Sequence, residues 1–186
     1  MLALINLYDG IVTGLRRQSD WLLPTLARFV FAAVLLNYFL KSGFSKLEGL
    51  FSPSFGSYYQ IFPKAIEAAG GDISQLGLFH KLVILAGSYA EIVLPILIVV
   101  GLFTRLASLG MIGFVIVQSL TDIYGHMLDD KTIGAWFDAG SGSLIMDQRA
   151  FWIMALILLI IKGAGPLSVD RLLVGSGLIR GGGDDR

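Results

Sequence analysis

The stretch "GSYAEIVLPILIVVGLF", Gly87–Phe103, holds one carboxylate, that of Glu91, among apolar side chains. A charged group at the centre of a bilayer costs roughly 3 to more than 10 kcal/mol, so such a residue normally has a partner or a function. Whether this stretch lies in a membrane therefore decides both the fold and the meaning of Glu91.

The composition of the chain points to a membrane protein. Of its 186 residues, 55% are hydrophobic and 15% are charged, whereas a soluble domain carries roughly 25% charged residues. The net charge is zero and no basic run is present, which argues against nucleic acid as a partner. The chain has no cysteine, so disulfides, thiolate metal sites and thiol redox catalysis within it are excluded.

Four segments are apolar and long enough to cross a bilayer, which requires roughly 20 residues. They are Trp21–Leu40, Leu82–Phe103, Leu106–Tyr124 and Arg149–Gly165. Each alone could be a buried helix of a soluble protein, but four in so short a chain argue against this alternative. We therefore predict an all-α fold, a transmembrane four-helix bundle.

The connections between these segments differ in character. Gly101 can end the second helix and Thr104 can cap the third, which predicts a tight hairpin. The first loop, "GLFSPSFGSYYQIFPKAIEAAGG", is rich in aromatic residues, which favour the headgroup region of a membrane. It predicts an interfacial or re-entrant segment with a short amphipathic helix near Pro63–Ala69. An ordinary loop folded over the bundle is the alternative.

The predicted organisation is a cytoplasmic N-terminal arm over residues 1–20, a four-helix membrane domain over residues 21–175 and a flexible tail over residues 176–186. With four spans, both termini share one side of the membrane. That side would hold eight Lys and Arg residues and the other side six. The positive-inside rule then places both termini in the cytoplasm and the two long loops outside.

The central position of Glu91 suggests two roles. Arg28 lies three residues from the midpoint of the first span, about 4.5 Å along a helix axis, so it would reach the depth of Glu91. An ion pair between Arg28 and Glu91 would offset much of the burial cost. Alternatively, Glu91 carries a ligand or a proton, with Tyr89 and Gln118 among the polar groups that could face the same interior and receive a quinone carbonyl.

The sequence predicts no metal site and no catalytic residue. His80 and His126 would lie near the same membrane face, and two such histidines could ligate a haem or a metal. No nearby cluster has metal-ligand spacing, so we interpret both as interfacial side chains. The sequence also has no phosphate-binding loop, nucleotide fingerprint or Ser-His-Asp set.

Three motifs occur in the order typical of a known family. "RFVFAAVLLNYFLKSGFSKLEG" resembles the first helix of the DoxX family, and "AEIVLPILIVVGLFTRLAS" is similar to its Glu-containing second helix and hairpin. "GAGPLSVDRLL" is similar to the closing signature of the family, with Pro166 and Val169 as departures. The resemblance covers Leu26–Leu173, and the motif positions are Arg28, Gly43, Lys46, Glu91, Gly101, Leu102, Thr104, Arg105, Gly163, Gly165, Ser168 and Asp170.

The resemblance implies a small four-helix integral protein of the bacterial plasma (inner) membrane. The family takes its name from a subunit of a thiosulfate:quinone oxidoreductase, and other members are linked to membrane oxidoreductase assemblies. The resemblance thus implies a membrane subunit or anchor that contacts the lipid bilayer and membrane or peripheral oxidoreductase subunits. Because the chain has no cysteine, sulfur chemistry would need another subunit or a bound cofactor.

Three functions remain as hypotheses. The first is a subunit of a quinone-linked redox complex, not catalytic alone, with quinone as the cofactor and a site around Arg28, Lys46, Tyr89, Glu91 and Gln118. The second is a structural or assembly protein bound to another membrane complex. The third is a small-solute transporter, but the fourth span is nearly all Leu, Ile and Met, which argues against a wide polar path.

Overall fold

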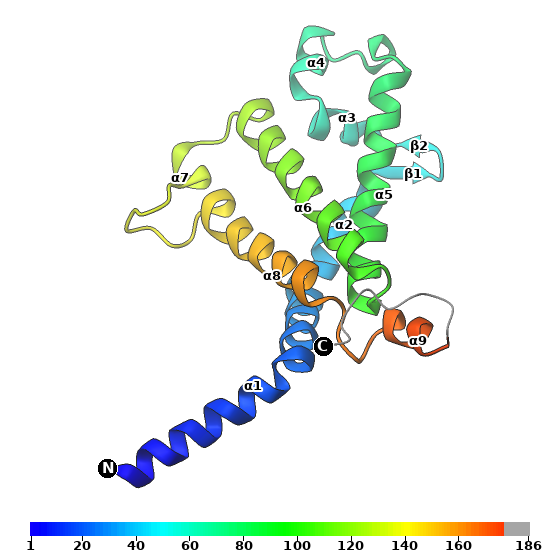
Figure 1. The fold of residues 1–186 in the computed structure, drawn as a ribbon. Coiled ribbons are helices and arrows are strands. Elements are labelled where there is room, and N and C mark those ends of the chain that lie inside the picture. Colours follow the sequence, from blue (N-terminus) through cyan, green and yellow to red (C-terminus); the bar gives the residue numbers. More distant parts are fainter. Residues whose placement is uncertain (177–186) are drawn as a thin grey trace.

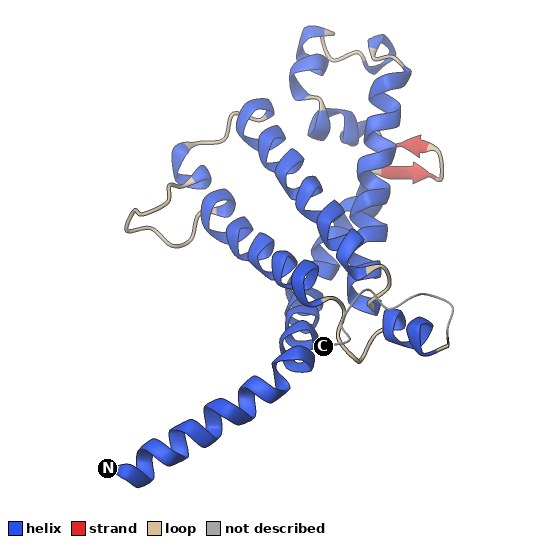
Figure 2. Cartoon of the chain, in the orientation of Figure 1, coloured by secondary structure: helices blue, strands red, loops and turns tan. Residues whose placement is uncertain are grey.

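The computed structural model describes residues 1–176, which are mostly helical (Figures 1 and 2). Four helical stretches are long and apolar enough to cross a membrane: Leu2–Ser45, Leu78–Val100, Thr104–Gly125 and Leu144–Lys162. The all-α, four-span prediction is therefore confirmed. The predicted flexible tail, 176–186, lies outside the described residues except for its first residue.

The elements follow one another as α1 (Leu2–Phe31), η1 (Ala32–Leu36), α2 (Asn37–Ser45), β1 (Leu47–Gly49), β2 (Ser52–Pro53), α3 (Phe55–Ile61), α4 (Pro63–Ala68), η2 (Ile73–Gln75), α5 (Leu78–Val100), α6 (Thr104–Leu120), η3 (Thr121–Gly125), α7 (Asp130–Ile133), η4 (Leu144–Gln148), α8 (Arg149–Lys162) and α9 (Val169–Gly175). We call the end of the bundle with the Gly101–Phe103 turn the hairpin end. The opposite end, which carries the loops at 46–77 and 126–143, is the loop end.

The apolar core lies where α1 and α2 meet α5, α6 and α8. It contains Phe31, Leu35, Phe39, Met111 and Leu156, all buried. The rings of Phe114 and Trp152 stand edge-on to Phe39, with centroids 6.1 and 6.0 Å away. Such aromatic contacts fix helix orientation where lipid supplies no hydrophobic driving force.

The first loop folds back along α5. A Cβ on Gly43 would lie 2.7 Å from Ile92 Cγ1 and 2.9 Å from the Ser88 carbonyl oxygen, so α2 ends against the middle of α5. The antiparallel pair β1–β2 follows beside α5 (Figure 1), with Leu50 and Phe51 exposed at its tip. Helix α4 confirms the short helix predicted near Pro63–Ala69, and the interfacial or re-entrant position of this loop stays a prediction.

The third connection contains short α7, which Asp129 caps. The Asp129 carboxylate accepts hydrogen bonds from the backbone N–H and the hydroxyl of Thr132, at 2.8 and 3.1 Å. These bonds favour the ionised form and lower the pKa of Asp129. Trp136 donates its indole N–H to the Met146 carbonyl at 3.0 Å, which ties this exposed loop to η4.

At the hairpin end, the Arg28 guanidinium binds four backbone carbonyls. It donates to Ile98 at 3.0 Å and to Val99, both in the last turn of α5. It also donates to Ala164 at 2.9 Å and Leu167 at 2.6 Å, in the turn after α8. The last carbonyls of a helix have no partner within the helix and carry partial negative charge. Arg28 therefore joins α1, α5 and the 163–168 turn.

The predicted ion pair between Arg28 and Glu91 is wrong. The first span continues to Ser45 rather than ending at Leu40, so Arg28 lies near the hairpin end and not at mid-depth. It contacts Ile98, which is seven residues beyond Glu91, or about 10 Å along the α5 axis. The positive charge that pairs with Glu91 therefore belongs to another residue, which is described with the cavity below.

Three of the motifs seen in the sequence meet around Arg28. Gly101 ends α5 with φ +73°, and a Cβ there would lie 2.6 Å from Ser168 Cβ and 2.9 Å from Arg28 Cζ, so only glycine fits. Ser168 caps α9 as predicted, accepting from the Arg171 N–H. The cap predicted at Thr104 is wrong: Asp170 caps α6 from outside, accepting from Phe103 N at 2.7 Å and Thr104 N at 3.0 Å.

Replacing Arg28 with lysine should destabilise the fold by about 2–4 kcal/mol, because an ammonium cannot reach four carbonyls that surround a planar fork. Denaturant unfolding of the purified chain in detergent measures this loss. Arg16→Lys, at an exposed position of α1, is the matched control and should leave stability unchanged. Equal stability of the two variants would contradict the role assigned to Arg28.

Candidate functional site

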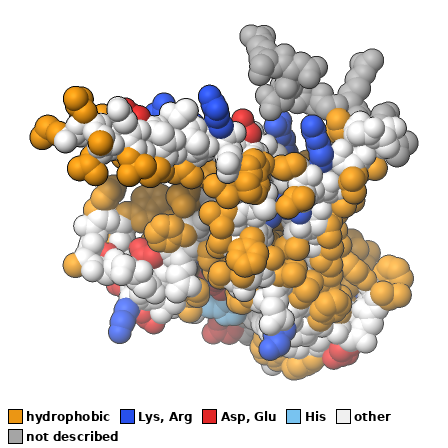
Figure 3. All heavy atoms as spheres, turned by 90° about the horizontal axis from the view of Figure 1, so that it is seen from below, with side chains coloured by type: hydrophobic (Ala, Val, Ile, Leu, Met, Phe, Trp, Pro, Cys, Tyr) orange, Lys and Arg blue, Asp and Glu red, His pale blue; other side chains and the backbone are white. Residues whose placement is uncertain are grey.

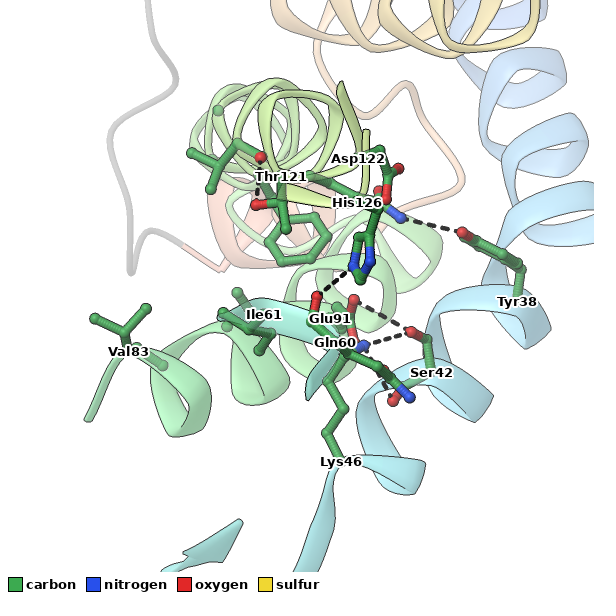
Figure 4. Close-up of a pocket in the computed structure, with 18 residues that line it drawn as sticks. Tyr38, Ser42, Lys46, Gln60, Ile61, Val83, Glu91, Thr121, Asp122 and His126 are labelled. Atoms are coloured by element: carbon green, nitrogen blue, oxygen red, sulfur yellow. Dashed lines mark hydrogen bonds and ion pairs between the residues drawn. The ribbon is translucent and has the colours of Figure 1, made fainter. Parts of the chain in front are cut away.

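A cavity of about 580 Å³ opens between α2, α5, α6 and α3 in the loop-end half of the bundle (Figure 4). Ligand pockets in proteins commonly have volumes of about 300–1,000 Å³. Its polar lining comes from Tyr38, Ser42, Lys46, Gln60, Glu91, Gln118, Thr121, Asp122 and His126, and its apolar lining from Ile61, Val83, Ala86, Gly87, Ala90, Gly110, Gly113, Phe114 and Val117.

Two of the helical stretches present polar side chains to the cavity at intervals of four residues. Tyr38, Ser42 and Lys46 follow one another along α2 and its last turn. Gln118, Asp122 and His126 do the same along α6 and η3. Residues four apart share one face of a helix. Segment η3 is π-helical, and such wide turns are frequent at functional sites.

The counter-charge of Glu91 is Lys46. Lys46 Nζ lies 2.7 Å from Glu91 Oε2, and the two side chains are 9% and 3% exposed. Lys46 also donates to Ser42 Oγ at 2.6 Å, and the Ser42 hydroxyl donates to Glu91 Oε1 at 3.3 Å. A buried pair is tolerated when further hydrogen bonds satisfy its members, and Ser42 supplies them here.

Across the cavity, Gln118 donates its amide N–H to the Tyr38 hydroxyl oxygen at 3.1 Å. Gln118 Oε1 is buried and has no hydrogen-bond donor among the residues that the structure describes. A buried polar atom without a partner costs free energy. The cavity therefore offers a ligand one free acceptor, and the Tyr38 hydroxyl, on a side chain that is 43% exposed, can donate to it.

A second ion pair stabilises the wall of the cavity. Asp122 pairs with Arg149 of α8, which is almost fully buried and also donates to Ser119 Oγ at 2.8 Å. His126 Nε2 lies 2.8 Å from the Gln60 carbonyl oxygen, so the His126 ring joins η3 to α3 over the cavity (Figure 4). These contacts hold the covering loop against the transmembrane helices.

Glycines create part of the free space. A Cβ on Gly87 of α5 or Gly113 of α6 would meet no atom within 4 Å, and one on Gly110 would meet only the Leu94 side chain at 3.3 and 3.5 Å. Small residues on transmembrane helices usually allow close packing. At Gly87 and Gly113 the space is instead left open to the cavity.

The cavity brings together three of the five residues that sequence reasoning singled out. Lys46, Glu91 and Gln118 line it. Arg28 lies at the hairpin end, and Tyr89 donates its hydroxyl to the Leu50 carbonyl in the β1–β2 turn. Both of these side chains hold the fold together outside the cavity.

Sequence reasoning missed Tyr38, Ser42, Asp122 and most of the role of His126. The signal that could have found them is the four-residue spacing, which links Tyr38 and Ser42 to Lys46 and links Asp122 and His126 to Gln118. Within residues 1–176, no group of three or more His, Cys, Asp or Glu side chains is placed to hold a metal ion.

A sequence model of the DoxX family matches residues 23–121, which are 99 of the 186 residues. The chain belongs to the DoxX family. Searches found no matching curated protein and no matching solved structure. The matched range contains Arg28, Lys46 and Glu91 of this DoxX protein. The Gly163–Asp170 signature lies beyond it, but its residues contact Arg28, Phe103 and Thr104 within the matched range.

Replacing Glu91 with glutamine should cost about 3–5 kcal/mol of stability, because it leaves Lys46 buried without a counter-charge. The double variant Lys46→Met/Glu91→Gln removes both charges and should recover most of this loss. Unfolding in detergent, followed by circular dichroism, compares the two variants with the parent chain. A double variant that is less stable than Glu91→Gln would contradict the assigned pair.

Proposed function

We propose that this DoxX protein is a membrane subunit of a quinone-linked oxidoreductase complex in the bacterial plasma membrane, and that its cavity holds the quinone headgroup. The observation that carries the proposal is the combination of apolar walls with a buried Lys46–Glu91 pair and the Tyr38 hydroxyl. The resemblance to a family named for a quinone-linked subunit supports the same class of ligand.

The chemistry of a quinone fits the lining of the cavity. Its two carbonyl oxygens accept hydrogen bonds, and a hydroquinone donates them. Tyr38 and Lys46 supply donors, and Gln118 Oε1 supplies an acceptor. Phe114 and Val117 extend the apolar wall along α6, where a prenyl chain would leave toward the lipid.

In this proposal the chain binds the quinone and another subunit moves the electrons. The chain has no cysteine, so an iron–sulfur cluster or a redox-active thiol would belong to a partner. Trp136 and Phe137 are exposed in the acidic loop after η3, and exposed aromatic residues are typical of contact surfaces. We propose this loop as the docking site of a partner and place both termini in the cytoplasm.

The transporter hypothesis has less support from the geometry. A transporter needs a site that opens alternately to both sides of the membrane. Here the cavity lies in the loop-end half, while the Arg28 side chain and the 163–168 turn fill the hairpin end.

Gly113→Leu should abolish quinone retention with little loss of stability, because a side chain at this position grows into free space of the cavity. The parent and variant chains are extracted from their own membrane in mild detergent, and copurifying quinones and proteins are measured by mass spectrometry. Gly175→Leu is the matched control, because a Cβ there also meets no atom within 4 Å but the residue lies in α9.

The parent chain and Gly175→Leu should retain quinone together with oxidoreductase subunits. A parent chain that emerges with bulk lipid alone would contradict the proposed function. Equal quinone retention by folded Gly113→Leu would contradict the proposed position of the headgroup.

A further inference from the structure

The first twenty residues form an arm that is helical and continuous with the first transmembrane span. Figure 1 shows this arm leaving the bundle, and its apolar side chains from Leu4 to Leu15 are exposed. The sequence predicted an arm here but did not predict that it is an unbroken part of α1. Its exposed faces therefore need an explanation of their own.

The arm has one apolar face and one polar face. Its apolar side chains recur at helical spacing and are largely exposed: Leu4, Ile5, Leu7, Tyr8, Ile11 and Leu15. The opposite face carries Asn6, Asp9, Thr13, Arg16, Arg17 and Asp20. This division is typical of helices that lie in the interface between water and lipid.

The root of the arm lies at the level where the bundle leaves the membrane. Trp21 follows the arm directly, and tryptophan favours the interface. Asp20 pairs with Lys162, the last residue of α8, at 2.7 Å. The first span thus emerges level with the end of α8, close to the headgroups. From this level an arm either extends into water or lies along the bilayer surface.

Pro24 gives α1 a place to change direction. It lies inside the helix, three residues after Trp21, and proline in a helix interior removes a hydrogen bond and favours a kink. Pro24 is held by the 163–168 turn, because a Cβ on Gly165 would come within 3.0 Å of its Cγ. Figure 1 shows the arm running at an angle to the part of α1 that packs on the bundle.

The hairpin end that surrounds the root is basic. Arg16, Arg17, Arg105 and Arg171 are exposed there. Of the acids among the described residues, Asp20 pairs with Lys162 and Asp170 caps α6, while Asp9 lies farther out on the polar face of the arm. The view from this end shows blue side chains near the arm and orange along one side of the arm (Figure 3). Basic residues beside an amphipathic helix attract anionic lipid headgroups.

We propose that residues 2–20 lie on the membrane surface as an interfacial helix, with the Leu4–Ile11–Leu15 face inserted among the lipids and the Arg16–Arg17 side in contact with water and anionic headgroups. The occupant of the apolar face is the same bilayer that surrounds the transmembrane part of α1, so the lipid contact continues from the span onto the arm. This inference does not depend on quinone binding.

Fluorescent labelling of the full chain tests this arrangement, because the absence of cysteine permits single-cysteine variants. Ile11→Cys reports the apolar face and Thr13→Cys the polar face. Each variant is labelled with an environment-sensitive dye and reconstituted in vesicles of equal phosphatidylcholine and phosphatidylglycerol. Quenching is measured with nitroxide-bearing lipids and with aqueous iodide. Leu4→Cys and Asn6→Cys form a second pair in case one label perturbs the helix.

The probes at positions 4 and 11 should be quenched by nitroxide lipid at least about twofold more than those at positions 6 and 13, with the reverse order for iodide. Equal quenching of both faces by iodide would overturn the proposal, because the arm would then extend into water. A probe at position 11 shielded from both quenchers would also overturn it, because a second copy or another protein would cover the apolar face.

Discussion

The arrangement of this DoxX protein depends on one buried guanidinium. Arg28 binds two of the last carbonyls of α5 and two carbonyls of the turn after α8, at a helix end where the helix itself supplies few donors. The glycine at position 101 allows that approach, and Asp170 caps α6 from the same turn. Residues from three sequence motifs thus form a structural joint rather than a catalytic centre.

Arg28 fixes the helices at the hairpin end, and the cavity lies in the opposite half of the bundle, near the loop end. There part of the wall is formed by Gly87 and Gly113, where an added Cβ would meet no atom within 4 Å. The covering loop is held by the contact between His126 and the Gln60 carbonyl. The Lys46–Glu91 pair lies in this half, where a ligand could compete for its hydrogen bonds. The cost of burying the Glu91 charge is offset by Lys46, and the proposed function uses the same pair to bind a ligand.

Hydropathy and local motifs were sufficient to predict the four spans, the short helix at Pro63–Ala68 and the cap at Ser168. They did not predict the partner of Glu91, because the predicted first span ended at Leu40, before the polar residue Lys41, whereas the helix continues to Ser45. Because of this difference, the predicted depth of Arg28 in the membrane was wrong: it lies near the hairpin end and not level with Glu91. Most of the cavity lining also escaped prediction, because it depends on which faces of separate helices meet.

The central claim is that the joint around Arg28 and the cavity have separate roles, and the dissociation constant of a short-chain benzoquinone tests it most directly. It is measured in lipid nanodiscs for the parent chain, Arg28→Lys and Lys46→Met/Glu91→Gln. We predict that folded Arg28→Lys binds within about twofold of the parent and that the double variant binds at least about tenfold more weakly, a difference of about 1.4 kcal/mol. Loss of binding in folded Arg28→Lys, with binding retained in the double variant, would contradict it.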